Sequence, residues 1–343
     1  MQTSVSEMNY NKSKNKRGLK GVYAVESSQR KRVLAPFLSV FLAVLTLLPG
    51  CSSASAPVDN PKPIALPAAA VTQNAGTLPP APPTSKQPDL RITFLDVGQG
   101  DSIFIQTPHG KTLLIDAGDN TAGAKVTAYL QDQGIKRLDA VVWTHPHADH
   151  IGGADMVTQA FSIGQVYMPK VSANTEAYRD LLKSMQGKHL KALEAKAGLT
   201  LDLDPEVKAQ FLAPSATHYE DTNDYSAVLR LTYGENSFLF TGDAQTASEQ
   251  EMLAGGYILK ADVLKVGHHG SHSSTSSTFL AKVQPGYAVI SVGQGNDYGH
   301  PHKETLAALA KAGIKVYRTD ESGSIIAESD GKKISFTTLG GHP

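Results

Sequence analysis

The chain has 343 residues, 41% of them hydrophobic, which is enough for one large domain or two modest ones. Its formal net charge is zero, but residues 1–89 carry ten Lys/Arg against four Asp/Glu, which leaves 22 basic and 28 acidic residues in 90–343. The main part of the chain is therefore acidic, which argues against a protein that binds duplex DNA through a broad positive surface. The single cysteine, Cys51, excludes an intrachain disulfide.

Residues 1–50 resemble a secretory leader. Arg30-Lys31-Arg32 is followed by an apolar run from Val33 to Leu48 and then by Pro49-Gly50. A basic segment, a short apolar segment and a small residue before the cleavage point are typical of a signal peptide. Because Cys51 comes directly after the small residue, as in a lipobox, we expect it to be lipidated and the protein to be exported and held on the outer face of the cell membrane. Secretion and an uncleaved membrane anchor are the alternatives.

The next stretch, 51–89, is predicted to be a disordered tether rich in Pro and Ala. Nine of the 19 prolines lie between Ser52 and Asp89, among Ala, Ser and Thr and without apolar periodicity. Such a composition cannot bury enough apolar surface to fold. The folded domain is expected to span residues 90–343.

From Leu90 onward the pattern is rich in strands and then alternates strands with helices. Short apolar runs bounded by turn residues predict strands, and apolar residues at helical spacing predict helices. The predicted strands are Leu90–Asp96, Ile103–Thr107, Thr112–Asp116, Ala140–Thr144, Val228–Thr232, Ser237–Thr241, Asp262–Val266, Tyr287–Ser291, Ser324–Ser329 and Lys333–Thr338. The predicted helices are Ala122–Gln133, Tyr178–His189 and Lys303–Ala312. Two mixed sheets with helices outside fit this order.

The strongest chemical signal follows the predicted strand Ala140–Thr144. There the chain places three imidazoles and a carboxylate within six residues, at His145, His147, Asp149 and His150. Neutral imidazoles and carboxylate oxygens are ligands that zinc and similar divalent ions take. The spacing puts the first two histidines on one side of a loop and lets the Asp-His pair face a second ion. The sequence therefore predicts a metal site.

This His-x-His-x-Asp-His motif resembles the hallmark of the metallo-β-lactamase superfamily. Within that superfamily, the chain is similar from Leu90 to its C-terminus to the hydrolase domain of the competence protein ComEC and its stand-alone relatives. Five further segments carry the similarity: Phe94–Asp101, Leu114–Gly118, Leu239–Ala244, Leu264–Ser271 and Tyr298–His302. The resemblance implies an α/β fold, the four-layer αββα metallo-β-lactamase sandwich, with the site at one edge between two sheets.

The resemblance and the local sequence together give the expected metal ligands. The resemblance assigns Asp243, which follows an apolar strand, the role of bridging two ions. His268 and His269 follow the predicted strand Asp262–Val266. Because adjacent residues of an extended segment point to opposite faces, only one of the two is expected to complete the second metal site. His269, directly before Gly270, is preferred, and both remain candidates. The expected ligands are His145, His147, Asp149, His150, Asp243, His268 and His269.

A further group of residues is expected beside the ions or against the substrate. Asp116, in a Leu-Ile-Asp-Ala-Gly run, is expected to orient a ligand. Asp96 and Asp101 flank two glycines, which suggests a tight loop approaching the site, and His300 is expected to reach the substrate. The group comprises Asp96, Asp101, Asp116, Asn223, Ser226, Ser271 and His302, and catalytic roles are expected for Asp149, Asp243 and His300.

One expected ligand has no counterpart in the chain. Many members of the superfamily supply a third imidazole to the first ion from a loop before the bridging aspartate, but the corresponding stretch here, 222–226, reads Thr-Asn-Asp-Tyr-Ser. His218 lies nearby in sequence and is expected at the surface. The Asn/Ser-type loop is similar to that of the ComEC branch. It leaves the first ion short of a strong ligand, which brings manganese into consideration beside zinc.

The resemblance implies a hydrolase with two divalent ions, zinc or manganese, about 3.5–4 Å apart and sharing a hydroxide that attacks the substrate. The first hypothesis is a phosphodiesterase or nuclease acting on DNA or RNA outside the cytoplasm, with no protein partner. The alternatives are an esterase for a small phosphodiester, such as a phosphocholine group, and a β-lactam or lactone hydrolase. The best-known true metallo-β-lactamases place a cysteine in the second site. The only cysteine, Cys51, lies at the cleavage point of the leader, outside the predicted hydrolase domain, which excludes that class.

Overall fold

The computed structural model describes residues 89–340. Cys51, the predicted leader and almost all of the predicted tether lie outside the described residues, so the domain boundaries at residues 50 and 89 stay predictions. Within the described part of the chain, no helix is long and apolar enough to cross a membrane.

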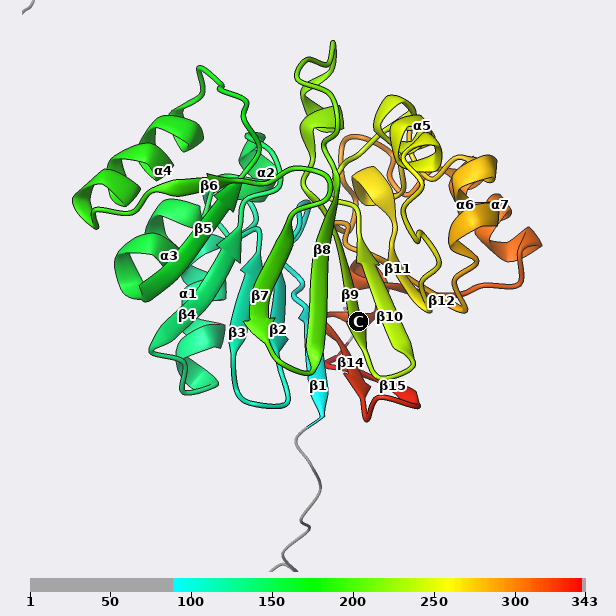
Figure 1. Ribbon diagram of the computed structural model, residues 1–343, viewed down its shortest axis with the longest axis horizontal. Coiled ribbons are helices and arrows are strands. Elements are labelled where there is room, and N and C mark those ends of the chain that lie inside the picture. The colour runs from blue at the N-terminus through cyan, green and yellow to red at the C-terminus, as the bar shows by residue number, and fades with distance from the viewer. Residues whose placement is uncertain (1–88, 341–343) are drawn as a thin grey trace, which may run out of the picture. The chain divides into compact units, whose positions relative to one another are not determined.

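Two mixed β-sheets form the centre of the described domain (Figure 1). In the first sheet the strand order is β15 (Ile334–Thr338), β14 (Ile325–Ser329), β1 (Leu90–Phe94), β2 (Ile103–Gln106), β3 (Thr112–Ile115), β4 (Arg137–Val142), β5 (Ser162–Met168), β6 (Ala192–Glu194). In the second it is β13 (Lys315–Arg318), β12 (Tyr287–Ile290), β11 (Val263–Lys265), β10 (Asn236–Phe240), β9 (Val228–Tyr233), β8 (Val207–Ala213), β7 (Thr200–Asp204). Strands β3 to β6 are parallel neighbours, and so are β10 to β13.

Apolar side chains fill the space between the two sheets, because successive residues of a strand point to opposite faces. Leu90, Ile92 and Phe94 of β1 point into this core, as do Phe238 and Phe240 of β10. The rings of Phe94 and Phe240 lie 6.2 Å apart. The two sheets are therefore held together by direct packing of their inner faces.

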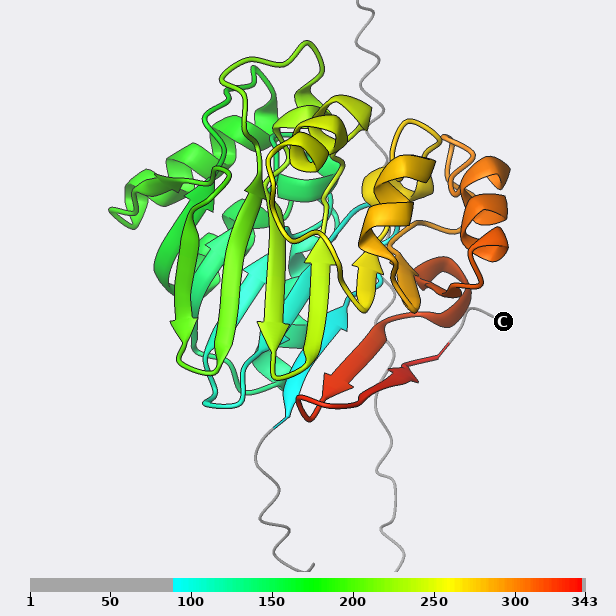
Figure 2. The ribbon, with the colours of Figure 1, turned by 45° about the vertical axis from the view of Figure 1, so that its right-hand side comes forward.

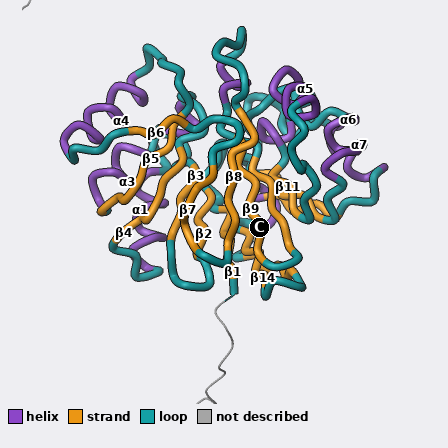
Figure 3. The backbone as a smooth tube through the Cα atoms, viewed as in Figure 1, coloured by secondary structure: helices purple, strands orange, loops and turns teal. Residues whose placement is uncertain are grey.

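Helices cover the outer face of each sheet (Figures 2 and 3). On the first sheet lie α1 (Gly123–Asp132), α3 (Ala154–Ala160) and α4 (Glu176–Gly187), and on the second lie α5 (Thr246–Ala254), α6 (Ser277–Val283) and α7 (Lys303–Lys311). Two single-turn helices, α2 (Ala148–Ile151) and α8 (Thr319–Ser322), and the 3₁₀ turns η1 (Thr222–Tyr225) and η2 (Gly267–Gly270) lie in loops. The layers run helix, sheet, sheet, helix, which confirms the predicted αββα sandwich.

The predicted strands and helices are present, with shifts of a few residues at their ends. Elements outside the prediction include β5, β7, β8, α3, α5 and α6. Helix α5 shows why, because its buried residues include Ser248 and Glu249 and no apolar stripe runs along it. The Glu249 carboxylate accepts hydrogen bonds from the backbone N–H groups of Thr275 and Ser276, so tertiary contacts bury it.

Parallel pairing brings the polar loops of both sheets to one edge. Asp116 follows β3 and Thr144 follows β4, whose last residues are paired in register. Asp243 follows β10, which is parallel to β11 and its following turn η2. Between the sheets, the Ala227 N–H donates to the Thr144 carbonyl at 2.9 Å. Side chains from four strand ends therefore meet at one edge of the sandwich.

Gly100 allows the first of these loops to approach closely, and its replacement is a test of the fold. Its φ is +142°, and an added Cβ would lie 2.3 Å from the Asp149 carbonyl oxygen. We expect Gly100→Ala to lower the free energy of unfolding by at least about 2 kcal/mol, measured in urea, since both the backbone strain and the clash with a rigid carbonyl are unfavourable.

Gly110→Ala is the matched control. Gly110 also has a positive φ, +74°, but an added Cβ would meet nothing within 4 Å. Its cost should be only the left-handed backbone penalty of about 1–2 kcal/mol. Equal losses in the two variants would show that the contact with Asp149 does not matter.

Candidate metal centre

Asp116 fixes the start of the His-rich loop. Its carboxylate accepts hydrogen bonds from the Thr144 backbone N–H at 2.8 Å and from the Thr144 hydroxyl at 2.6 Å. The same carboxylate lies 2.8 Å from Nδ1 of His150, and Asp116 and His150 are fully buried. An Nδ1–H bond to a carboxylate leaves Nε2 of the imidazole as a free electron-pair donor. Asp116 therefore lies beneath a candidate ligand and orients it.

Four side chains form one compact cluster of candidate ligands. Asp149, His150, Asp243 and His269 each place one ligand atom within 4.8 Å of the others. Nε2 of His269 lies 3.1 Å from the Asp149 carboxylate and 3.4 Å from Asp243, and Nε2 of His150 lies 3.2 Å from Asp243. The residues come from the loops after β4, β10 and β11. Both sheets thus contribute to a single donor set.

His145 and His147 form a second pair of imidazoles beside Asp243. Nε2 of His145 is 3.0 Å from Nδ1 of His147 and 3.9 Å from the Asp243 carboxylate. The Ser226 hydroxyl lies 3.3 Å from Nδ1 of His145 and accepts a hydrogen bond from the Asp243 backbone N–H at 3.0 Å. The Asp243 carboxylate therefore lies near two groups of imidazoles, His150 with His269 and His145 with His147, and the Ser226 hydroxyl contacts both His145 and the Asp243 backbone.

The charges of the cluster favour ionised carboxylates. Burial alone would lower the pKa values of His150 and His269, but the surrounding carboxylates, Asp243 first among them, together outweigh it and raise both pKa values well above their usual range. Burial would likewise raise the pKa of Asp243, but these two imidazoles hold it well below its usual range, and the pKa of Asp149 is also lowered. The carboxylates are therefore available as ligands at neutral pH.

The backbone at His268 and His269 differs from the prediction. The prediction treated the segment as extended, but both residues have left-handed φ values, 47° and 53°, inside the turn η2. His269 is buried, and its Nδ1 lies 3.0 Å from the Ser291 carbonyl, which directs Nε2 to the cluster. His268 is partly exposed at the rim, 3.7 Å from Asp243. The geometry favours His269 as the ligand, for a reason other than strand alternation.

A buried ion pair lies behind His269. Lys265 is fully buried, and its ammonium lies 2.7 Å from the Asp101 carboxylate and donates to the Val266 carbonyl at 3.0 Å. Asp101 also lies 3.5 Å from Nδ1 of His269. Burial would raise the pKa of Asp101, but the Lys265 charge, a hydrogen bond with His269 and the charges of His269 and His150 together outweigh it and the pKa is lowered. The sequence prediction did not include Lys265. A lysine within the apolar strand before the His-His pair is nevertheless unusual, and this could have identified it as part of the site.

Three other predicted residues lie outside the cluster. Asp96 accepts a hydrogen bond from the Gly98 N–H at 3.1 Å and pairs with Lys125 at 3.4 Å. The Ser271 hydroxyl contacts Ser273, and it is Ser273 that lies 3.1 Å from Nδ1 of His268. Nδ1 of His302 accepts a hydrogen bond from the His272 N–H at 3.0 Å, in a neighbouring hollow.

His300 lies at the rim of the centre. Its ring centroid is 5.4 Å from that of His268 and 6.3 Å from that of His269. Burial, followed by the charges of those two imidazoles, lowers the pKa of His300 to about 4. The ring is therefore neutral at neutral pH and suited to hydrogen bonding, whereas the sequence interpretation gave no protonation state.

The cluster opens into a hollow of about 350 Å³ that is also lined by Gln99, His147, Asn223, Tyr298 and His300. None of its lining residues is Ser, Thr, Cys or Lys, so water is the candidate nucleophile. Oδ1 of Asn223 is buried and has no hydrogen-bond partner in the described part of the chain. His218, by contrast, is exposed. Gln99 and Tyr298 were not among the predicted residues, although both lie inside the segments that carry the family resemblance.

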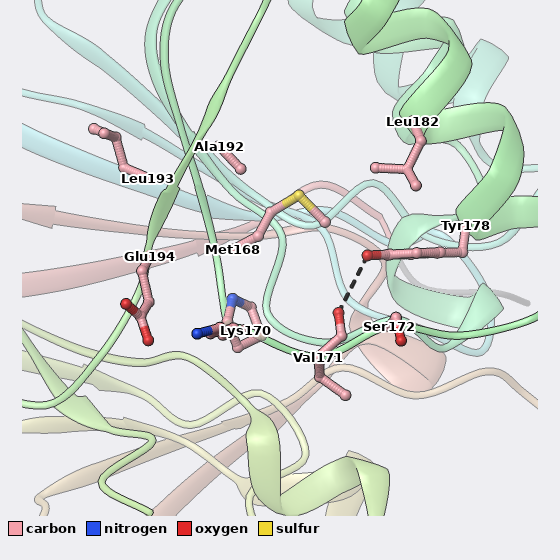
Figure 4. A pocket seen from close by; sticks show the side chains of 10 residues that line it. Met168, Lys170, Val171, Ser172, Tyr178, Leu182, Ala192, Leu193 and Glu194 are labelled. Atoms are coloured by element: carbon pink, nitrogen blue, oxygen red, sulfur yellow. Dashed lines mark hydrogen bonds between the residues drawn. The ribbon is translucent and has the colours of Figure 1, made fainter. Parts of the chain in front are cut away.

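Another hollow, of about 390 Å³, lies between α4 and the edge strand β6 (Figure 4). Met168, Leu182 and Leu193 give it an apolar lining, and the Tyr178 hydroxyl donates to the Val171 carbonyl at 3.2 Å. Its lining includes no histidine and a single carboxylate, that of Glu194. This larger hollow therefore lacks the histidine and carboxylate donors that a metal centre needs.

The donor set of the cluster fits a divalent metal ion. Two imidazole nitrogens and two carboxylate oxygens converge, which is a common ligand combination for such ions. Within the described residues, Nε2 of His150 and Oδ1 of Asp243 are buried without a hydrogen-bond partner. Buried polar atoms are rarely left unpaired, so a ligand at this point would satisfy both.

The sequence model of the metallo-beta-lactamase superfamily matches residues 95–294. The chain belongs to the metallo-β-lactamase superfamily. With its buried His/Asp site, it is a metal-dependent hydrolase of that superfamily.

Proteins named for competence and recombination are related to this superfamily member. It is 35% identical over 251 residues to ComE operon protein 3 of Bacillus subtilis, covering 68% of this chain and 32% of that protein. It is 32% identical over 244 residues to Recombination protein 2 of Haemophilus influenzae, covering 70% of this chain and 29% of that protein. It is 32% identical over 295 residues to Competence protein ComA of Neisseria gonorrhoeae, covering 85% of this chain and 40% of that protein. The match spans about a third of the length of these relatives.

The position of Asp116 leads to a prediction about metal affinity. Asp116→Asn keeps the size of the side chain but removes the charge that holds Nδ1–H of His150. We expect zinc affinity, measured by calorimetry on the metal-free protein, to fall about 10- to 100-fold, the usual effect of losing such a partner. Asp180→Asn, on the exposed face of α4, is the control and should bind zinc as the native protein does. Unchanged affinity in Asp116→Asn would mean that His150 is oriented by other contacts.

Proposed function

We propose that this metallo-β-lactamase superfamily hydrolase is a phosphodiesterase that acts on nucleic acid outside the cytoplasm. The observation that supports it most is the arrangement around Asp243: one buried carboxylate lies beside two groups of donors, and the site opens to a hollow without a side-chain nucleophile. Such an arrangement suits a pair of ions that bind both the attacking and the leaving oxygen of a phosphodiester.

The two candidate sites differ in their donors. Asp149, His150, Asp243 and His269 would hold one ion, and His145, His147 and Asp243 would hold the other. Zinc, or manganese where the second group lacks a third imidazole, would polarise a phosphoryl oxygen and lower the pKa of a water. Burial, followed by the charge of His150, lowers the pKa of His145 well below its usual range, so that imidazole is neutral. His150 and His269, whose pKa values the neighbouring carboxylates raise, would release a proton when an ion binds.

Residues of the rim would act on the substrate directly. His300 is neutral and half-buried, and its Nδ1 has no hydrogen-bond partner among the described residues. It can hydrogen-bond a phosphoryl or leaving-group oxygen. Asn223, whose Oδ1 also has no hydrogen-bond partner among the described residues, lines the same hollow from another loop of the same sheet. Together they would position the phosphodiester over Asp243.

The choice of nucleic acid is supported by the relatives, which are named for competence and recombination. The acidic balance of residues 90–343 favours a smaller phosphodiester, such as a phosphocholine ester, as the second candidate. A substrate panel separates them: single- and double-stranded DNA, RNA, bis-p-nitrophenyl phosphate, p-nitrophenylphosphorylcholine and nitrocefin, each with zinc or manganese.

Asp243→Asn tests the central step. The change preserves shape but removes the charge that both groups of donors share, so we expect kcat on the best phosphodiester to fall at least about a hundredfold. Asp180→Asn should retain native activity. If the native enzyme turns over nitrocefin faster than any phosphodiester, and Asp243→Asn still loses activity, the protein is a β-lactam hydrolase and the phosphodiesterase proposal is wrong.

The export proposal rests on the sequence before residue 89. We propose that Cys51 is lipidated and anchors the enzyme on the outer face of the cell membrane. Cys51→Ser should release the protein from the membrane fraction or leave its leader uncleaved, and mass spectrometry of the mature N-terminus distinguishes the two. Ser52→Ala is the control. Membrane association of Cys51→Ser with an intact leader would indicate a plain membrane anchor.

A further inference from the structure

Tyr298 is an exposed aromatic side chain on the rim of the metal hollow. It is 66% exposed, lines the hollow and stacks on His300 with 5.6 Å between ring centroids and 20° between planes. A single exposed aromatic is ordinary on protein surfaces. The position of Tyr298 is what suggests a role in binding. One face of its ring stacks on His300, which borders the metal cluster, while most of the side chain stays accessible.

The loop that carries Tyr298 is fixed from within by Asn296. The Asn296 amide donates to the carbonyls of Gly293 at 2.9 Å and His300 at 2.6 Å. Its side-chain oxygen accepts from the backbone N–H groups of Tyr298 at 3.2 Å and His300 at 3.0 Å. The loop therefore keeps its shape without packing the Tyr298 side chain into the core.

The end of the same loop is attached to the metal ligands. The His302 N–H donates to the Gly270 carbonyl at 3.0 Å, directly after His269. An added Cβ at Gly270 would lie 2.6 Å from Cβ of Pro301, so the two segments are in close contact. The Tyr298 ring is therefore held at a set position relative to the cluster, and binding against a preorganised group loses little entropy.

A polar hollow of about 460 Å³ adjoins this rim. It shares Gln99 with the metal hollow and is also lined by Thr121, Gln294 and Asn296. Amide and hydroxyl groups hydrogen-bond the edges of nucleobases and the hydroxyls of sugars. Tyr298 is the single Phe, Tyr or Trp residue among the linings of the two hollows. A cage for a quaternary ammonium group uses several aromatic rings, so this rim suits a flat base better than choline.

We propose that Tyr298 is a stacking platform for a nucleobase of the substrate, next to the phosphodiester at the metal centre. The proposal rests on the proposed phosphodiesterase function and specifies its substrate class as a nucleotide-containing phosphodiester. Stacking on an aromatic ring tolerates every base and needs no positive surface. It thus explains how a domain with more acidic than basic residues can bind a nucleotide, for which phosphate contacts alone are poorly suited.

Two substrates with the same leaving group test the platform. The p-nitrophenyl esters of thymidine 5′-monophosphate and of methyl phosphate are both phosphodiesters, but the first alone has a base. We expect Tyr298→Leu to lower the ratio of their kcat/KM values about 10- to 100-fold, mainly through the KM of the thymidine ester. Tyr298→Phe, which keeps the ring, should retain the native ratio. Ile258→Ala, a 71% exposed side chain that lines neither hollow, is the surface control.

The outcomes separate this proposal from the proposed function. An unchanged ratio in Tyr298→Leu, with metal content equal to that of the native protein, would overturn the platform and leave the phosphodiesterase intact. A strong preference of the native enzyme for p-nitrophenylphosphorylcholine that is lost in Tyr298→Leu would overturn it in favour of a choline site.

Binding measurements decide the platform even if the enzyme cleaves no phosphodiester. In that event the proposed function fails, and calorimetry with thymidine 5′-monophosphate on the zinc-loaded protein provides the test. Weaker binding by Tyr298→Leu, with binding retained in Tyr298→Phe, would support base stacking. Equal binding by the native protein and both variants would overturn it.

Discussion

The Asp243 carboxylate is the group on which the rest of the site depends. It is 2% exposed, and one of its oxygens lies 3.2, 3.4, 3.7 and 3.9 Å from nitrogens of His150, His269, His268 and His145. An isolated buried carboxylate is unfavourable by several kcal/mol. Its surroundings must therefore supply positive charge or donors, and the loops of both sheets converge to do so. A pair of metal ions would meet the same need.

This convergence requires unusual backbone geometry at the ligands. His268 and His269 both have left-handed φ values, which cost about 1–3 kcal/mol each in a residue other than glycine. The His268 N–H donates to the Gly242 carbonyl at 3.1 Å, which holds the turn against the loop of Asp243. An added Cβ at Gly152 would lie 2.3 Å from the backbone nitrogen of Asn120. The chain directly after the His-rich loop therefore packs so closely that it has no room for a side chain. Both the strained backbone and the close packing hold the candidate ligands in position.

The centre and the rim make different contributions to function. The buried cluster supplies the chemistry of a hydrolase, and nothing in Asp149, His150, Asp243 or His269 distinguishes one phosphodiester from another. In the proposed function, selectivity would belong to the groups at the rim of the hollow, namely Tyr298 stacked on His300 and the amides around Gln99. Because these groups are neutral, recognition at the rim should depend less on salt than binding through phosphates would.

The sequence by itself predicted two mixed sheets with helices outside and a His-rich metal site, and its family resemblance implied the αββα sandwich and the bridging role of Asp243. Periodicity and spacing act locally, so the strand before His145 and the run of donors after it are visible in the chain alone. The tertiary structure decided what depends on distant segments. It placed His269 rather than His268 in the cluster, turned Asp96 towards Lys125 and put Ser273, not Ser271, beside His268. It also buried Lys265 against Asp101 and brought Tyr298 to the metal hollow, because residues more than 150 positions apart meet only when the two sheets pack.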